Sequence, residues 1–233
     1  MQQVDLADAY RRFVLGFLDM PKHLRVVVDA SKGVAWTGSV FGQSIPSSYF
    51  LDYQGQTVTK LAAEIVPLAP PLISLRGNKA IIAGLGGSGN SAYKGRPELF
   101  EVDTETGSIK QLTRLSETGV PRPLFLESQG LLLYSFTPDS ESLGQQLRML
   151  DVNGDRSRQL IRTGTGSRIF QASLSPDKKE AAYIVCSQEC QLSVMDLGAV
   201  NRRDLGSFSS PEGDIGFLLP PVISWVASSL DAT

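Results

Sequence analysis

Four aspartates recur along the chain at a nearly fixed spacing, each at the end of a short apolar segment. Asp52, Asp103, Asp151 and Asp196 are separated by 51, 48 and 45 residues. Around them, short runs rich in β-branched and aromatic residues alternate with turns built from Gly, Pro, Asn and Asp, a pattern typical of strands joined by tight turns. A β-only repeat of this length, with four strands per unit, predicts the blades of a β-propeller.

The predicted domain covers residues 25–233. Antiparallel blades are expected at residues 25–61, 72–113, 123–161 and 169–206, and residues 222–233 supply the first strand of a fifth blade. We favour an incomplete ring, because a propeller must close to remove its free strand edges and four blades plus one strand is an awkward number for closure.

Residues 1–24 precede the repeats and are predicted to carry an amphipathic helix. Its apolar side chains recur at spacings of three and four over residues 4–19, which places them on one helix face: Leu6, Tyr10, Phe13, Val14, Phe17 and Leu18. Both a docking helix and a helix packed on its own β domain fit this pattern, and we favour the second.

Charge and hydropathy limit the partners. The net charge is −2, from 22 basic and 24 acidic residues without a long run of one sign, which speaks against a nucleic-acid partner. No apolar run reaches the roughly 20 residues needed to span a bilayer. Phe13–Leu18 is too short for a signal peptide and lacks a cleavage site. The sequence as given predicts a cytoplasmic protein, and a periplasmic or extracellular one if the true start lies upstream.

The inventory of catalytic groups is poor. His23 is the single histidine, it lies outside the repeats, and no G-x-S-x-G motif exists, so a Ser-His-Asp triad is not expected. Gly84–Gly89 matches G-x-G-x-x-G, but residues 90–97 cannot form the helix that a dinucleotide site needs. We therefore predict no catalytic residues and no cofactor, and interpret 84–97 as an inter-strand loop.

A metal site is not expected either. Asp151–Asp155 resembles the start of a calcium loop, but Arg156 and Arg162 stand where an EF-hand has its glycine and its bidentate glutamate. Asn153-Gly154 is instead a favoured hairpin turn pair.

Two cysteines, Cys186 and Cys190, flank a three-residue loop. Across a hairpin they would lie opposite each other, close to the separation that a disulfide requires, and without a histidine they cannot complete a zinc site. Both a cross-hairpin disulfide and a pair of free thiols fit the sequence. A disulfide would indicate an oxidising compartment, which conflicts with the absence of an export signal.

The fourth unit resembles a known repeat. Leu174-Ser-Pro-Asp177, Ala181-Ala-Tyr183 and Val194-Met-Asp196 are similar to the TolB-type, WD-repeat-like propeller repeat, although Leu174 replaces an aromatic residue and Lys178 replaces a turn glycine. The second unit also has kelch-like features around Ala83–Gly87. The resemblance implies a binding scaffold, such as an envelope protein that docks other proteins, or the propeller that gates an α/β-hydrolase peptidase. Neither places catalytic residues in the blades, so no site residues carry over.

Loop lengths indicate where binding occurs. Loops between second and third strands, and links between blades, emerge on one face of a propeller, and here these connections are the longer ones. Long loops on a rigid scaffold commonly carry binding residues. The candidate anchors are Phe41, Tyr93, Lys94, Arg96 and Arg168.

The predicted function is a non-enzymatic propeller scaffold that binds a protein or peptide through this face. The alternative is that the repeats form the gating or regulatory propeller of a larger enzyme, such as a serine peptidase of the prolyl oligopeptidase type.

Overall fold

The computed structural model describes residues 27–29, 33–38, 47–52, 57–62, 64–69, 71–73, 78–86, 95–127, 129–140, 143–153, 156–198, 201–209, 223 and 225. These residues form strands and no α-helix. No segment among them is a helix long and apolar enough to cross a membrane. The helix predicted at residues 4–19, His23 and most of the predicted fifth blade lie outside the described residues.

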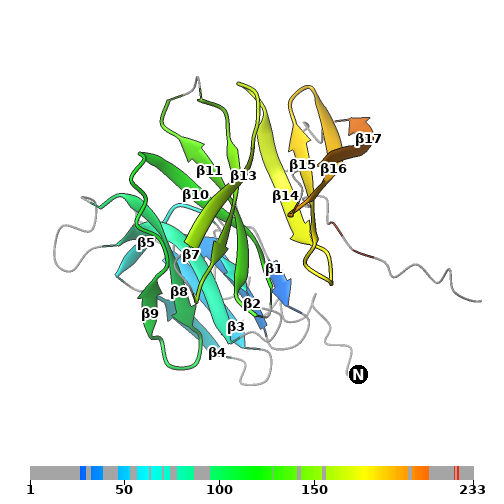
Figure 1. The fold of residues 1–233 in the computed structure, drawn as a ribbon. Helices are drawn as coiled ribbons and strands as arrows, with labels where there is room; N and C mark the ends of the chain where they lie inside the picture. The colour runs from blue at the N-terminus through cyan, green and yellow to red at the C-terminus, as the bar shows by residue number, and fades with distance from the viewer. Residues whose placement is uncertain are drawn as a thin grey trace, which may run out of the picture.

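Four antiparallel sheets follow one another along the chain, and in three of them the strand order follows the sequence (Figure 1). In the second sheet, the first two strands both pair with the third. The first sheet contains β1 (Val27–Asp29), β2 (Gly33–Gly38), β3 (Ser47–Asp52) and β4 (Thr57–Leu61). The second contains β5 (Ile65–Pro67), β6 (Leu72–Ile73), β7 (Lys79–Gly86), β8 (Pro97–Asp103) and β9 (Ile109–Gln111).

The third sheet contains β10 (Gly119–Leu126), β11 (Leu131–Pro138), β12 (Gln146–Asp151) and β13 (Arg156–Arg162). The fourth contains β14 (Arg168–Leu174), β15 (Glu180–Cys186), β16 (Glu189–Asp196) and β17 (Arg202–Ser209). The prediction of an all-β fold built from four-stranded antiparallel units is confirmed, and in the described part of the chain the sheets do not close into a ring.

The first strand of the second sheet is divided, which the sequence did not indicate. β5 pairs with residues 84–86 of β7, and β6 pairs with residues 80–81 of the same strand. Pro67 ends β5 and Pro71 directly precedes β6. A proline has no amide hydrogen to give to a sheet ladder, so the strand is interrupted between them. This sheet therefore begins at Ile65, upstream of the Leu72 start expected from the apolar pattern.

The four periodic aspartates occupy one repeated structural position. Each is the last residue of the third strand of its sheet and lies opposite the first residue of the second strand. The cross-strand pairs are Gly33 with Asp52, Lys79 with Asp103, Leu131 with Asp151, and Glu180 with Asp196. The period read from the sequence is thus a period of the sheets.

The aspartate side chains close the turns that follow them. The Oδ1 atom of Asp103 accepts hydrogen bonds from the amides of Thr106 (2.7 Å) and Glu105 (3.0 Å). The equivalent atom of Asp151 accepts from Asn153 (3.0 Å), and that of Asp196 accepts from Gly198 (2.6 Å). Aspartate favours such turns because its short carboxylate reaches the amides two or three residues ahead.

In the two inner sheets, the second and the third, the second strand is buried on both faces. On β7, Ile81 and Ala83 pack toward the third sheet, whereas Ala80 and Ile82 pack toward the first. On β11, Leu132, Tyr134 and Phe136 pack toward the second sheet, and Leu133 packs toward the fourth. The apolar clusters therefore lie between the sheets and hold them face to face, as is expected of strands that have no wet side.

The fourth sheet carries a disulfide between Cys186 and Cys190, which lie directly opposite each other on β15 and β16. Of the two alternatives for these cysteines, the structure has the bonded one. Both residues are buried, together with Ile184, against the partly buried Phe170, Leu192 and Ile223.

Burial on both faces predicts the effect of truncating two consecutive residues. Leu132→Ala and Leu133→Ala should each reduce the free energy of unfolding by about 2–5 kcal/mol, because each deletes buried methyl groups. The exposed Leu205→Ala should change it by less than about 0.5 kcal/mol. Denaturant unfolding of the three variants measures this, and a mild effect for either Leu132 or Leu133 would contradict a sheet packed on both sides.

The turn carboxylates predict a pH dependence. The hydrogen bond from the Thr106 amide is the main cause that lowers the pKa of Asp103 below its usual value. The ionised form therefore stabilises the fold above about pH 4, and this contribution is lost as the pH falls through the folded-state pKa. Asp103→Ala should melt below the wild type at neutral pH, and the gap should narrow in acid. Thermal unfolding measures it, and a gap that stays constant to about pH 2 would contradict the role of the charge.

Candidate functional site

The connections between strands emerge on two opposite faces. At the long-loop face the second strands end and the third strands begin, and the sequence between them spans residues 39–46, 87–96, 139–145 and 187–188. The links between sheets start from the same face and span residues 62–64, 112–118 and 163–167. Three of its inter-strand loops are long, but the fourth is the two-residue turn beside the disulfide, and the first link is short. In the described part of the chain, the turns of the opposite face are short, and three of them are closed by the periodic aspartates.

Two of the five predicted anchors lie in the described part of the chain, and both are on the long-loop face. Arg96 directly precedes β8, and Arg168 is the first residue of β14. Phe41, Tyr93 and Lys94 lie outside the described residues. The two arginines belong to different sheets, the second and the fourth.

The two arginines differ in their surroundings. Nη1 of Arg96 donates to the carbonyl oxygens of Ser116 (2.9 Å) and Leu115 (3.3 Å), so this side chain holds the link between the second and third sheets. Arg168 is exposed and forms no ion pair with another described residue. Both arginines are exposed, but only Arg96 holds backbone carbonyl groups of other described residues.

A buried carboxylate fixes the same link from inside. Glu98 is only 8% exposed, and its two oxygens accept hydrogen bonds from the Thr113 hydroxyl (2.5 Å) and the Leu115 amide (2.9 Å). The Thr113 hydroxyl in turn accepts from the Leu99 amide (2.9 Å). Buried polar groups must be paired in this way, because an unmet one carries a large desolvation penalty. In sequence, Glu98 is one acidic residue in an alternating strand, and nothing there marks it as buried.

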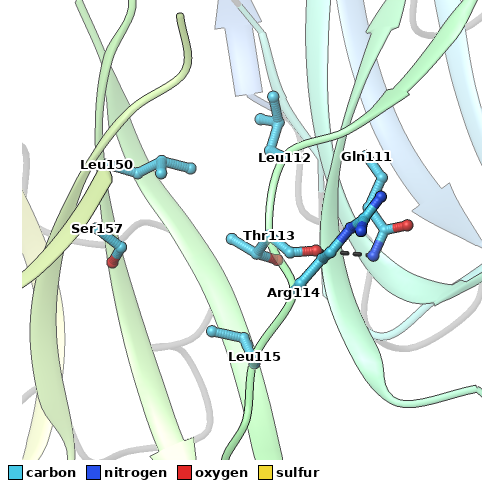
Figure 2. Close-up of a pocket in the computed structure, with 7 residues that line it drawn as sticks. All are labelled: Gln111, Leu112, Thr113, Arg114, Leu115, Leu150 and Ser157. Carbon is cyan, nitrogen blue, oxygen red and sulfur yellow. Dashed lines mark hydrogen bonds between the residues drawn. The ribbon is translucent and has the colours of Figure 1, made fainter. Parts of the chain in front are cut away.

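The link borders a cleft between the second and third sheets. The cleft has a volume of about 470 Å³. Figure 2 shows the link on one side and two residues of the third sheet on the other. The residues that line this inter-sheet cleft are Gln111, Leu112, Thr113, Arg114, Leu115, Leu150 and Ser157.

Two side chains bridge the sheets on either side of the lining residues. Lys110, just before the link, donates from Nζ to the carbonyl oxygen of Val152 (2.8 Å). Arg148 donates from Nη2 to both carboxylate oxygens of Glu117 (2.9 and 3.0 Å). The two bridges lie on either side of the lining residues in both sequence segments. Residues 111–115 lie between Lys110 and Glu117, and Leu150 lies between Arg148 and Val152. The bridges therefore fix the distance between the link and the third sheet.

The cleft combines apolar walls with hydrogen-bonding groups. Leu112 and Leu150 belong to the cluster between the second and third sheets. The hydroxyl oxygen of Ser157 lies 2.8 Å from that of the buried Tyr134, and Nε2 of Gln111 donates to the carbonyl oxygen of Thr113 (2.7 Å). In the described residues, no three His, Cys, Asp or Glu side chains gather closely enough to hold a metal ion. The cleft is thus lined by apolar, hydrogen-bonding and charged side chains.

The motif Gly84–Gly89 begins inside a strand. Gly84 and Gly86 belong to β7, and a Cβ atom on Gly84 would lie 2.5 Å from the Val66 carbonyl oxygen and from Ile65 Cγ2. A Cβ atom on Gly86 would lie 2.6 Å from the Phe100 ring. These two glycines therefore allow close packing within the second sheet, which explains them without a nucleotide.

No protein-family model matches the sequence, and no curated protein matches it. Solved structures do match. A putative TolB from Agrobacterium tumefaciens is 12% identical with a TM-score of 0.56, and TolB from Acinetobacter baumannii is 17% identical with a TM-score of 0.50. The fold is that of a TolB-type β-propeller.

The same TolB-type fold also matches part of an enzyme. A puromycin-hydrolyzing peptidase from Mycobacterium tuberculosis is 12% identical with a TM-score of 0.57, and the match covers 81% of this chain and 32% of that one. For the two TolB structures the match covers 76% and 75% of this chain, and 62% and 40% of theirs. The chain therefore spans less than two thirds of each of these structures, and at such identities the likeness shows the fold alone.

The hydrogen bonds of the buried Glu98 carboxylate predict that this residue stabilises the link between the second and third sheets. Glu98→Gln should lower the free energy of unfolding by about 1–3 kcal/mol. The glutamine side chain has a single acceptor oxygen, and its NH2 group cannot accept the hydrogen bond that the second carboxylate oxygen receives from the Thr113 hydroxyl or the Leu115 backbone amide. Hydrogen exchange of the Leu115 amide should accelerate with it. Glu189→Gln, at an exposed position of the fourth sheet, is the control, and equal behaviour of the two variants would contradict the role of Glu98.

Proposed function

We propose that this TolB-type propeller is a non-enzymatic scaffold that binds a protein or peptide through its long-loop face. The observation that carries the proposal is the contrast between the two faces. One face has short turns, three of them closed by aspartate carboxylates, whereas the other has longer loops and the link that borders the inter-sheet cleft. Binding residues are usually found on loops that a rigid scaffold positions.

The described surface chemistry supports recognition more than catalysis. The long-loop face offers the exposed guanidinium of Arg168 and the exposed apolar side chain of Leu143. Arginine is frequent among the residues that dominate binding energy in interfaces, because its planar head combines charge, hydrogen bonding and stacking.

Charge reversal at matched positions of the fourth sheet tests the proposal. A peptide-display library is selected on the immobilised protein, and the dissociation constants of the recovered peptides are measured by fluorescence anisotropy. Arg168→Glu should weaken the binding of these peptides by about tenfold or more, which corresponds to about 1.4 kcal/mol.

Lys179→Glu is the control, because Lys179 is an exposed cation in a short turn of the opposite face of the same sheet. Peptides that bind both variants as tightly as the wild type, or a selection that recovers no specific peptide, would overturn the assignment of this face.

A second candidate function follows from the likeness to the peptidase. In it, the chain is the gating or regulatory propeller of a larger enzyme, and the chemistry lies in another domain. Labelling of the full gene product by a fluorophosphonate probe, at a serine outside residues 25–233, would support this candidate, since such probes react with activated serine nucleophiles. The absence of labelling would favour the scaffold.

A further inference from the structure

Repeat-equivalent positions explain why the inter-sheet cleft is open. Ser157 on β13 lies opposite Leu150, and Arg202 on β17 lies opposite Met195. Leu150 and Met195 each directly precede the aspartate that ends the third strand of their sheet. Ser157 of the third sheet and Arg202 of the fourth sheet therefore occupy the same place in the repeat.

The side chains at this repeat position differ between the third and fourth sheets. The Arg202 guanidinium lies 5.9 Å from the centroid of the Tyr183 ring and donates to Asp204 (2.9 Å) and Gln191 (3.1 Å). Tyr134 is the repeat equivalent of Tyr183, because each is the fourth residue of its strand. Beside Tyr134 stands the short Ser157, and the space that an arginine covers in the fourth sheet is part of the cleft in the third.

The charges around the cleft favour an anion. Arg114 lines it and Lys110 borders it, and neither forms an ion pair with any residue in the described part of the chain. Three acidic groups lie near the cleft, and Asp151 is turned to the Asn153 amide. Glu117 is bound by Arg148, and Glu98 is buried with its oxygens turned to the link. An incoming carboxylate would meet two cations that have no ion-pair partner among the described residues.

The lining is mixed, and its aliphatic groups select what accompanies the charge. Leu112 and Leu115 of the link, and Leu150 across from them, are aliphatic groups that a branched hydrocarbon chain can contact, while the Ser157 hydroxyl offers a hydrogen bond (Figure 2). Pockets that combine apolar and polar groups bind amphipathic ligands in this way.

We propose that the inter-sheet cleft binds an aliphatic group with a neighbouring carboxylate, as an extended acidic peptide presents at a leucine next to an aspartate or glutamate. The proposal rests on the proposed peptide-binding function and supplies its chemical class. An aliphatic carboxylate is the smallest ligand that carries both features.

The test uses 4-methylpentanoate as a probe and follows the backbone amides of residues 111–115 by ¹⁵N NMR titration. The carboxylate should shift these amides in a saturable way, with a dissociation constant in the millimolar range that is typical of a fragment with few heavy atoms. The amine of the same carbon skeleton should bind at least about tenfold more weakly, because its charge is repelled by Arg114 and Lys110.

Two variants and two controls complete the test. Ser157→Arg should fold normally, because the fourth sheet holds an arginine at this position, and it should cover the cleft and weaken the probe by about tenfold or more. Arg114→Glu should weaken it to a similar degree by repulsion. Ser207→Arg on the outermost strand of the fourth sheet and Lys179→Glu on the opposite face should stay within about twofold of the wild type.

The outcomes separate this inference from the proposed function. Shifts outside the cleft, equal binding of the amine, or binding that survives Ser157→Arg would overturn the inference, even if displayed peptides still depend on Arg168. Cleft-specific binding of 4-methylpentanoate without any recovered peptide would uphold the aliphatic-carboxylate site and overturn the peptide scaffold.

Discussion

The structure depends on the burial of its second strands on both faces. A sheet whose strands have one solvent-exposed face needs a neighbouring sheet on only one side. On β7, however, Ile81 and Ile82 are buried on opposite faces, and on β11 the same holds for Leu132 and Leu133. Each inner sheet must therefore lie between two others, and the chain is forced into a series of facing sheets rather than a sandwich of two.

The same constraint explains the apolar surface of the fourth sheet. Leu160 on β13 and Leu205 on β17 are the unpaired residues at equivalent β-bulges of the third and fourth sheets. Leu160 is partly buried against the cluster between these two sheets, whereas Leu205 is 57% exposed. The position is apolar because it packs against a following sheet where one is present, and among the described residues no such sheet covers β17.

Much of this architecture could be predicted from the sequence, because the periodic aspartates serve two roles at once. Asp103, Asp151 and Asp196 each end a strand and cap the next turn, so their spacing records the structural repeat directly. The division between β5 and β6 could not be predicted in the same way, since two short apolar runs on either side of prolines look like a loop and a strand.

The candidate site was less predictable because its parts meet across sheets. The contact between Lys110 and Val152 joins residues 42 positions apart, and no local pattern encodes it. Arg96 was predicted as a binding anchor from its loop position, yet its guanidinium holds the carbonyl groups of residues 115 and 116. Residue type and loop location do not reveal that an arginine also fixes its own backbone.

The inter-sheet cleft is related to the position of one arginine in the repeat. This arginine is on the third strand in the third sheet and on the fourth strand in the fourth sheet. Gln146 and Gln191 are equivalent in the repeat, and each accepts a hydrogen bond from an arginine, Arg148 on the third strand in one sheet and Arg202 on the fourth strand in the other.

On the third strand, the Arg148 guanidinium lies 4.5 Å from the centroid of the Phe136 ring and reaches Glu117 on the link, which leaves the outer position to a serine. The buried Nε2 atom of Gln146 finds no hydrogen-bond partner among the described residues, an arrangement that costs about 1–3 kcal/mol. This cost is tolerated where the glutamine oxygen orients the arginine that bridges the two sheets beside the cleft. At one equivalent position of the repeat, the third sheet thus has the serine that lines the cleft, whereas the fourth sheet has an arginine.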